Sequence, residues 1–278
     1  GCYNFDSFNY VSKNNNMEFN INLYEYTECR GSIKLPSVLF TFGKDKYDVL
    51  HNYSMYHFNN GYCRQTENRN EKWWYGPLFC GWGQQMHDNS NDPYSLATQS
   101  YYENLSKRIS ERGLEPKVII IDDKWQEKYG EAIPDKNKFP NLRSFCDEQH
   151  KQGRKVMLWF KSWSCEGLDN DECVTLWSQP YGADPTNPKY IERMKKTIHY
   201  LISDDEGCCN CDGFKIDFAN CMPLGRGLQT YEKGVYGIEL LKRLISLIYT
   251  LTKSEKPDAL INNSCCHPYF YEVTDQVR

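Results

Sequence analysis

The pattern of apolar and polar residues changes character near residue 73. Before this point apolar residues alternate with polar ones, as in residues 17–23, and a period of two predicts β-strands with one buried face. A helical period follows over residues 45–59, and a polar linker leads from there to residue 72. We therefore predict part of a β-rich N-terminal domain, with its linker, over residues 1–72.

From residue 73 to residue 278, short apolar strands alternate with helical segments, which is typical of βα units around a parallel sheet. Five or six units in one direction, with no glycine-rich phosphate loop after any strand, favour a (β/α)8 barrel of the TIM type over a doubly wound sheet. Because the count stops short of eight, we expect an α/β barrel that is incomplete at its C-terminus, in a chain that is a fragment. The predicted strands span residues 78–83, 117–125, 155–160, 212–218 and 259–262, and a sixth begins after residue 272.

Polar and aromatic residues gather where the predicted strands end. In a barrel these carboxyl ends form one mouth, which is where catalytic residues lie. Carboxylates, amides and a lysine among tryptophans suit a pyranose, because they offer fixed partners for its hydroxyls and flat apolar surfaces for its C–H face. The residues in question are Trp82, Asp122, Asp123, Trp125, Trp159, Lys161, Lys215, Asp217 and Asn262.

The segment 212–218 carries the most informative chemistry. Side chains alternate along a strand, so Lys215 and Asp217 share one face, and a carboxylate beside an ammonium stays ionised at neutral pH. Asp217 is therefore a candidate nucleophile, and a salt bridge without catalytic role is the alternative. The adjacent Asp122 and Asp123 form a second candidate pair, one pointing inward and the other outward or into the next loop; a turn and helix-start signal is the alternative reading.

The composition of the chain limits the kinds of molecule that it is expected to bind. The net charge is −4 with interspersed charges, so neither nucleic acid nor a membrane surface is an expected partner, and no stretch is apolar for long enough to span a membrane. The 13 cysteines, an odd number, indicate reduced thiols in a cytoplasmic protein, although Gly1 leaves open a removed N-terminal segment. The cluster at residues 208–211 lacks a second Cys/His pair, so we expect no metal and no cofactor. Homo-oligomerisation stays open.

The order of the motifs resembles the clan of retaining α-glycosidases that includes the α-galactosidases of glycoside hydrolase families 27 and 36 and the α-glucosidases of family 31. The motifs are GWG, IIDDKWQ, DKNKFPNLRSFCDEQHKQGRKVMLWF, DPTNPKYIERM and DGFKIDF, and the resemblance covers about residues 73–278. The N-terminal β region resembles the β-sandwich that precedes the barrel in family 36. The resemblance implies Asp217 as the nucleophile, hydroxyl binding by Lys215, Asp122 and Asp123, and walls of the −1 subsite made by Trp82, Trp125 and Trp159.

The implied mechanism is a double displacement, in which Asp217 attacks the anomeric carbon and water later releases the sugar with retained configuration. It needs a second carboxyl group roughly 5 to 5.5 Å from the first, as the general acid. Asp275 is the one aspartate near the sixth strand. The resemblance, however, places an arginine in that strand, here Arg278, and the acid a few residues after it. Asp275 is thus either the acid or a connector carboxylate.

We therefore expect an α-galactosidase-like hydrolase of terminal α-linked sugars in oligosaccharides, since the Asp-Asp pair leans toward the galactosidases of the clan. A transglycosylase of the raffinose-synthase type would use the same site. A non-catalytic sugar-binding or scaffold protein on a decayed barrel is the alternative from another class. A metal-dependent barrel hydrolase would need ligands such as His87 and His267 at the mouth.

Overall fold

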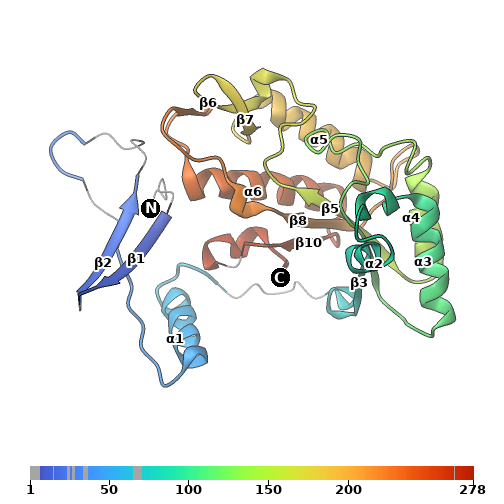
Figure 1. Ribbon diagram of the computed structural model, residues 1–278, viewed down its shortest axis with the longest axis horizontal. Coiled ribbons are helices and arrows are strands. Elements are labelled where there is room, and N and C mark those ends of the chain that lie inside the picture. The colour runs from blue at the N-terminus through green and yellow to red at the C-terminus, as the bar shows by residue number, and fades with distance from the viewer. Residues whose placement is uncertain are drawn as a thin grey trace.

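The computed structural model of the protein describes residues 7–14, 16–23, 26, 29–33, 37–64, 71–265 and 267–278. A six-stranded parallel sheet forms its centre (Figure 1). The strands lie side by side in the order in which they occur in the chain, whereas the order reverses in a doubly wound sheet. They are β3 (Leu78–Cys80), β4 (Val118–Ile121), β5 (Lys155–Lys161), β8 (Gly213–Asp217), β10 (Leu260–Asn263) and β11 (Gln276–Val277).

The helices that connect these strands pack on the sheet and share one apolar core with it (Figure 1). In α5, for example, Asn187 caps the N-terminus by accepting from the backbone N–H of Lys189, and Pro188 occupies the first turn. The buried residues of α5 then recur at helical spacing, so one stripe of the helix enters the core. The connecting helices are α3 (Gln99–Glu111), α4 (Leu142–Lys151), α5 (Pro188–Ile202) and α6 (Gly237–Glu255).

The sheet is open. β3 and β11 are its two edge strands, and in the part of the chain that the structure describes no strand joins them. Inside the sheet β8 and β10 approach closely because Gly213, at φ 139°, has no Cβ; a Cβ there would lie 2.0 Å from the carbonyl oxygen of Leu260. The prediction of an α/β barrel that is incomplete within this chain is therefore confirmed.

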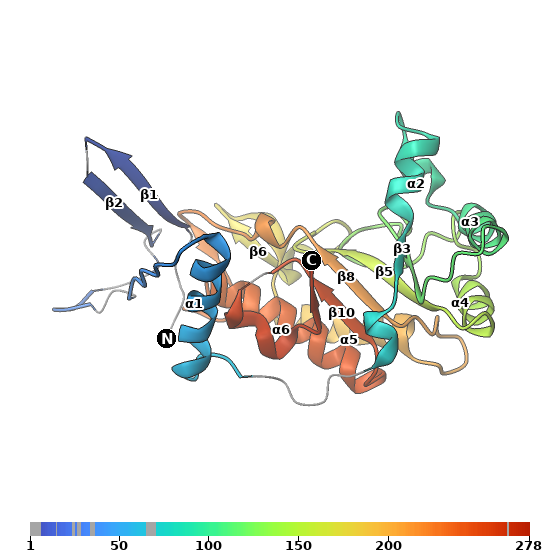
Figure 2. The same ribbon diagram turned by 90° about the horizontal axis from the view of Figure 1, so that it is seen from below.

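The N-terminal part is a hairpin and a helix that do not belong to the six-stranded sheet (Figures 1 and 2). β1 (Ser7–Lys13) pairs antiparallel with β2 (Asn16–Asn22), and α1 (Lys46–Asn59) begins at Asp45, whose carboxylate accepts two backbone N–H groups. Among the described residues this hairpin makes a two-stranded sheet and no sandwich. The division of domains at residue 72 stays a prediction.

The first predicted strand is shorter than expected. Residues 78–83 were predicted as strand, but β3 ends at Cys80 and α2 (Gly81–Asp88) follows at once. Gly81 permits this change, because a Cβ at that position would lie 2.0 Å from the hydroxyl oxygen of Tyr102. Trp82 therefore lies on a helix and not at a strand end.

A second sheet, which the sequence did not predict, is made from the segments that follow the carboxyl ends of β5 and β8. Its order is β7-β6-β9, and all pairs are antiparallel. The strands are β6 (Cys173–Leu176), β7 (Gln179–Ala183) and β9 (Leu228–Gln229). Short 3-10 helices complete the fold: η1 (Lys72–Tyr75), η2 (Pro93–Leu96), η3 (Asn170–Glu172), η4 (Ala219–Cys221) and η5 (Pro268–Val273).

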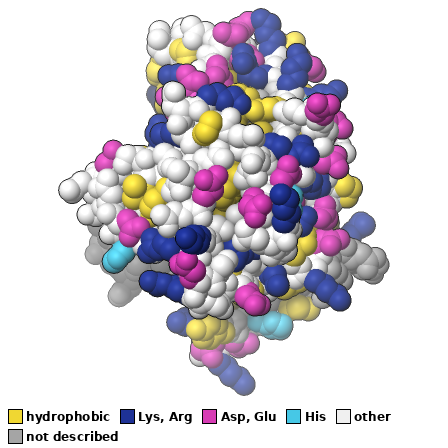
Figure 3. All heavy atoms as spheres, turned by 90° about the vertical axis from the view of Figure 1, so that its right-hand side faces the viewer, with side chains coloured by type: hydrophobic (Ala, Val, Ile, Leu, Met, Phe, Trp, Pro, Cys, Tyr) yellow, Lys and Arg dark blue, Asp and Glu magenta, His cyan; other side chains and the backbone are white. Residues whose placement is uncertain are grey.

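Acidic and basic side chains are interspersed on the face shown in Figure 3, which agrees with the small net charge. Of the helices in the described residues, none has the length and apolarity needed to cross a membrane.

Candidate active site

Register across the sheet brings the expected side chains into layers at the carboxyl ends of the strands. Lys215 on β8 is paired with Trp159 on β5 and with Asn262 on β10. One layer further along, Asp217 is paired with Lys161. Because paired residues in neighbouring parallel strands point to the same face, these five side chains share one face of the sheet.

Lys215 and Asp122 form the first ion pair of the site. The Nζ of Lys215 lies 2.6 Å from Oδ2 of Asp122, and both side chains are almost fully buried. Burial acts most strongly and disfavours the ammonium, but the charge of Asp122 and its hydrogen bond, with smaller contributions, together raise the pKa of Lys215. The sequence paired Lys215 with Asp217, its neighbour along the strand; the structure pairs it with a carboxylate from another strand.

Cys80, at the end of β3, joins this pair. Its Sγ donates to Oδ2 of Asp122 at 2.9 Å and accepts from Nζ of Lys215 at 3.6 Å. Burial, followed by the charge of Asp122, raises the pKa of the Cys80 thiol to about 11, so the thiol keeps its proton and remains a donor. Cys80 was not among the predicted site residues.

Asp217 is held by three donors and remains accessible. Its Oδ1 accepts from Nη2 of Arg278 at 2.8 Å and from the backbone N–H of Phe218 at 2.9 Å, and its Oδ2 accepts from Nε1 of Trp159 at 3.0 Å. Burial acts to raise the pKa of Asp217, but these hydrogen bonds and the charge of Arg278 together lower it. The side chain is 27% exposed, so an ionised oxygen can meet a ligand.

Asp123 is the second member of the acidic pair and points toward Tyr129. The Tyr129 hydroxyl donates to Oδ1 of Asp123 at 2.8 Å, and the Tyr129 ring packs against Trp159 with centroids 5.8 Å apart. Burial, together with the charge of Asp122, raises the pKa of Asp123 in spite of that hydrogen bond. Since α4 begins only at Leu142, the pair does not start a helix.

The ring of Tyr129 is also in contact with the ammonium groups of two lysines. The Nζ of Lys124 lies 3.8 Å from its ring centroid, and the Nζ of Lys161 lies 4.2 Å from it. Tyr129 belongs to the segment between β4 and α4, so its approach to β5 depends on the loop path. Tyr129 lies seven positions after Asp122 in a segment without a periodic pattern, so no pattern in the sequence could have identified it as a site residue.

The three tryptophans expected to form walls of a sugar subsite lie in three different surroundings. Trp125 is fully buried, and its indole N–H donates to the carbonyl of Trp159 at 2.7 Å, so its ring belongs to the core. Trp82 is half-buried on α2 beside Tyr94. Trp159 is the one of the three whose indole N–H binds Asp217, although only 2% of the residue is exposed.

The two C-terminal candidates and the β10 amide also differ in position. Arg278 reaches the site, where it bonds both Asp217 and the carbonyl of Ile216. Asn262 is 4% exposed and donates to Oε1 of Gln276 at 2.7 Å. It therefore lies in the lower layer, beneath Asp217.

Asp275 does not reach Asp217. It precedes β11 and is fully buried against α6, with Nζ of Lys253 at 2.7 Å and the backbone N–H of Ile261 at 2.9 Å. Its neighbour Gln276 shares the layer of Lys215, so alternation turns Asp275 to the opposite face. The assignment of Asp275 as the acid is therefore corrected: it is a connector carboxylate that fixes α6 to the sheet.

No metal centre is apparent in the described part of the chain, where no group of three or more His, Cys, Asp or Glu side chains could hold an ion. His267 bonds the hydroxyl of Tyr53 at 3.0 Å, on the side of α1, whereas His87 lies on α2. The two histidines thus belong to separate parts of the molecule.

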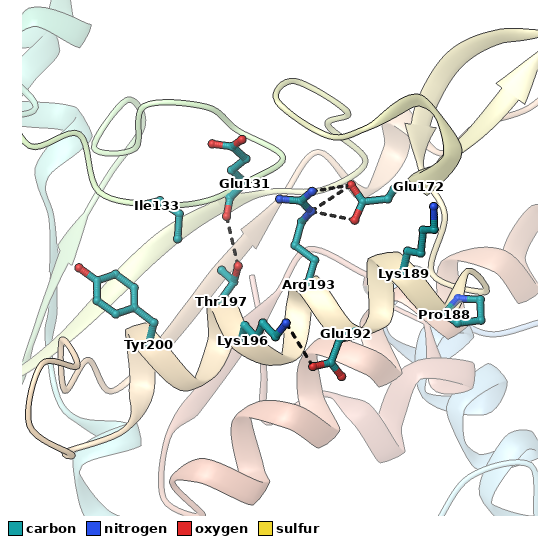
Figure 4. A pocket seen from close by; sticks show the side chains of 10 residues that line it. All are labelled: Glu131, Ile133, Glu172, Pro188, Lys189, Glu192, Arg193, Lys196, Thr197 and Tyr200. Atoms are coloured by element: carbon teal, nitrogen blue, oxygen red, sulfur yellow. Dashed lines mark hydrogen bonds and ion pairs between the residues drawn. The ribbon is translucent and has the colours of Figure 1, made fainter.

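A groove of about 910 Å³ lies elsewhere, along the outer side of α5 (Figure 4). Its charges are mostly paired: Nε of Arg193 lies 2.8 Å from Glu172, and Lys196 pairs with Glu192. Because paired surface charges offer little to a ligand, we place the site at the carboxyl ends of the strands and not at this groove.

Comparisons with known proteins agree with the geometry. Residues 70–237 match the model of the family described as the TIM-barrel domain of glycosyl hydrolases family 31. Among curated protein sequences none matches. A cycloalternan-degrading enzyme from Trueperella pyogenes, solved with cycloalternan, is similar with a TM-score of 0.56 and 15% identity over 80% of this chain and 34% of that one.

A cycloalternan-forming enzyme from Listeria monocytogenes, solved with a pentasaccharide substrate, gives a TM-score of 0.53 and 15% identity over 79% of this chain and 23% of that one. The chain thus spans about a quarter to a third of the length of these two enzymes. At this identity the likeness shows a shared fold.

Proposed function

Since the chain belongs to glycosyl hydrolases family 31 by its TIM-barrel domain, we propose that it acts as a retaining α-glycosidase with Asp217 as the nucleophile. The observation that carries this proposal is the state of Asp217. Its carboxylate is ionised, partly exposed and fixed by three donors at the carboxyl end of a barrel strand.

The contacts of Asp217 suit a double displacement. Trp159 holds Oδ2, while Arg278 and the Phe218 N–H hold Oδ1, so the carboxylate has one orientation when a sugar arrives. Attack by one oxygen on the anomeric carbon forms a covalent glycosyl-enzyme, and water later cleaves it. Because Asp275 faces α6, we do not propose it as the proton donor.

The buried ion pair suits recognition of sugar hydroxyls. Lys215 has protons beyond the one directed at Asp122, and Oδ1 of Asp122 accepts from the backbone N–H of Asp123 at 3.0 Å. We propose that these groups, with Asp123, bind hydroxyls of a terminal α-linked sugar. The relatives that form or degrade cycloalternan favour an oligosaccharide as substrate, and they lend no support to the galactoside specificity that the sequence suggested.

The test compares the protein with its Asp217→Asn variant on aryl α-glucosides and aryl α-galactosides. We expect the variant to lose at least about 10³-fold in kcat, because the nucleophile is removed. Asp204→Asn, at an exposed position, is the matched control and keeps the rate. Mass spectrometry after reaction with a fluorinated glycoside is expected to show a glycosyl group on the peptide that carries Asp217.

Three results would decide against parts of this proposal. Equal rates for the two proteins remove Asp217 from the mechanism. Sugar binding without turnover or labelling of any α-glycoside favours the non-catalytic alternative. Products longer than the substrate, formed in preference to free sugar, indicate a transglycosylase that uses the same site.

A further inference from the structure

Two lysines, one after β4 and one at the end of β5, lie against the same aromatic ring. The ammonium groups of Lys124 and Lys161 lie 3.8 Å and 4.2 Å from the ring centroid of Tyr129. Lys161 is also 5.7 Å from the ring centroid of Phe218. The two Nζ atoms therefore lie no more than about 8 Å from each other, since each is about 4 Å from the same ring centroid.

Neither ammonium has a carboxylate partner among the described residues, where no ion pair within 4.0 Å involves Lys124 or Lys161. Asp123 accepts from the Tyr129 hydroxyl and feels the charge of Lys124 without bonding it, and Asp217 accepts from Arg278. The ring face attracts each cation by about 1 kcal/mol, but it does not neutralise either charge. The pair therefore retains its positive field.

The ring that carries the lysines is fixed. Its hydroxyl is bonded to Asp123, its backbone N–H donates to Oε2 of Glu166 at 3.1 Å, and its face packs near Trp159. Burial raises the pKa of Tyr129, so the phenol is neutral and adds no negative charge. The two ammonium groups are thus presented from a rigid base next to the reacting carboxylate.

The other cations of the site have different partners. Lys215 is bound to Asp122, and Arg278 is bound to Asp217. Lys161 is paired in register with Asp217, which places it beside any sugar that this carboxylate could attack. Of the two lysines on the Tyr129 ring, Lys161 is therefore the one that lies next to the reaction centre.

We propose that Lys124 and Lys161, supported by Tyr129, form a subsite for an anionic substituent of the glycoside, namely a carboxylate, phosphate or sulfate group carried by the bound sugar or by the unit linked to it. This subsite rests on the proposed function in that the sugar lies over Asp217. Two ammonium groups without fork geometry suit a compact anion as point charges. The substrate class is then an acidic oligosaccharide and not a neutral one.

Isothermal titration calorimetry tests the proposal without requiring turnover. The probes are methyl α-glucoside, its 6-phosphate, methyl α-glucuronide and inorganic phosphate, each titrated into the protein and into the Asp217→Asn variant. We expect at least one charged glycoside to bind about tenfold or more tighter than the neutral one, and this difference to shrink as salt rises. Because binding is measured with and without the nucleophile, failure of the catalytic proposal leaves this result readable.

Variants assign the effect to the two lysines. Lys161→Met and Lys124→Met are expected to reduce the preference for the charged glycoside at least about fivefold each, whereas Lys161→Arg keeps it because the charge remains. Lys195→Met, which removes one charge from the exposed side of α5, is the matched control and keeps the preference. Circular dichroism checks that each variant is folded.

Two outcomes overturn the proposal. The first is that no charged glycoside binds tighter than the neutral one. The second is that inorganic phosphate binds as tightly as the phosphorylated glycoside and with the same dependence on Lys161, since that would indicate a site for a free anion.

Discussion

Asp212 and Asp217 lie at opposite ends of β8, and their surroundings differ in one respect that decides their roles. Asp212, just before the strand, is fully buried and accepts from Nε2 of His150 at 2.6 Å, Nζ of Lys155 at 3.0 Å and the backbone N–H of Val156 at 2.9 Å. It also accepts from Nζ of Lys256 at 3.4 Å. Asp217 has three donors and is 27% exposed. Both pKa values are lowered, so ionisation alone does not separate structural from reactive carboxylates; access does.

This difference follows the architecture of the barrel. At the amino ends of the strands, partners from α4 and β5, together with Lys256 after α6, close around Asp212 from all sides. At the carboxyl ends the loops leave the carboxylate of Asp217 partly open. Residues at the amino ends of the strands are expected to contribute to stability, and residues at the carboxyl ends are expected to take part in catalysis.

The largest expected effect separates the two aspartates by stability. We expect Asp212→Asn to lower the free energy of unfolding by about 3 kcal/mol, because the half-buried Lys155 and Lys256 lose a fully buried counter-charge. Asp217→Asn is expected to change it by about 1 kcal/mol or less, since its partner Arg278 is 34% exposed. Urea unfolding followed by circular dichroism measures both.

Asp258→Asn is the matched control for this comparison. It removes the second and more exposed carboxylate near Lys155, at 3.7 Å, and is expected to cost less than about 1 kcal/mol. A cost for Asp212→Asn no larger than that of the control would show that burial does not distinguish the two ends of the strand.

The second effect is a dependence of stability on pH. Burial acts to raise the pKa of Asp212, but the bond from His150 and the charges of Lys256 and Lys155 lower it to about 2, against an ordinary value of 3.8. Because the folded pKa is the lower one, its contribution of about 2 kcal/mol is present above about pH 4 and is lost as the pH falls toward 2. Urea unfolding between pH 2 and pH 6 is expected to show a steeper loss in the protein than in Asp212→Asn, and parallel curves would contradict this.

The third effect concerns the reactive end. Of the groups that lower the pKa of Asp217, Arg278 has the largest effect, so Arg278→Met is expected to raise that pKa. The acid limb of the kcat/KM profile then moves to higher pH. Arg243→Met, which breaks an exposed pair with Glu239 on α6, serves as the control. If the acid limb of the kcat/KM profile does not move in Arg278→Met, that limb reports the titration of a group other than Asp217.

Sequence pattern was enough for the strand order and for the face shared by Lys215 and Asp217, because both follow from periodicity and from the barrel rule. It was not enough to predict which side chains these residues contact. Lys215 meets Asp122 across 93 residues of chain, and this distance depends on how β4, β5 and β8 lie side by side. The position of Tyr129 depends on a loop that has no period.

Two errors have local causes. Trp125 was predicted as a wall of the subsite, but after the strand end at Ile121 the chain turns, with Lys124 at φ 69°, and the indole enters the core. Asp275 was a candidate acid because of its place in the sequence. Once β11 is known to begin at Gln276, alternation alone assigns Asp275 to the face of α6.

The smallest expected effect concerns Cys80, which lies at the reactive end and whose thiol bonds the side chains of Asp122 and Lys215. Cys80→Ala removes one hydrogen bond to a carboxylate that keeps its bond to Lys215, so we expect KM for an aryl α-glycoside to rise about fivefold with little change in kcat. Cys80→Ser retains a donor and is expected to restore most of the affinity, whereas Cys221→Ala, at an exposed thiol, leaves KM unchanged. A KM for Cys80→Ala equal to that of the parent protein would mean that Asp122 keeps its position without Cys80, and that β3 contributes no positioning group to the site.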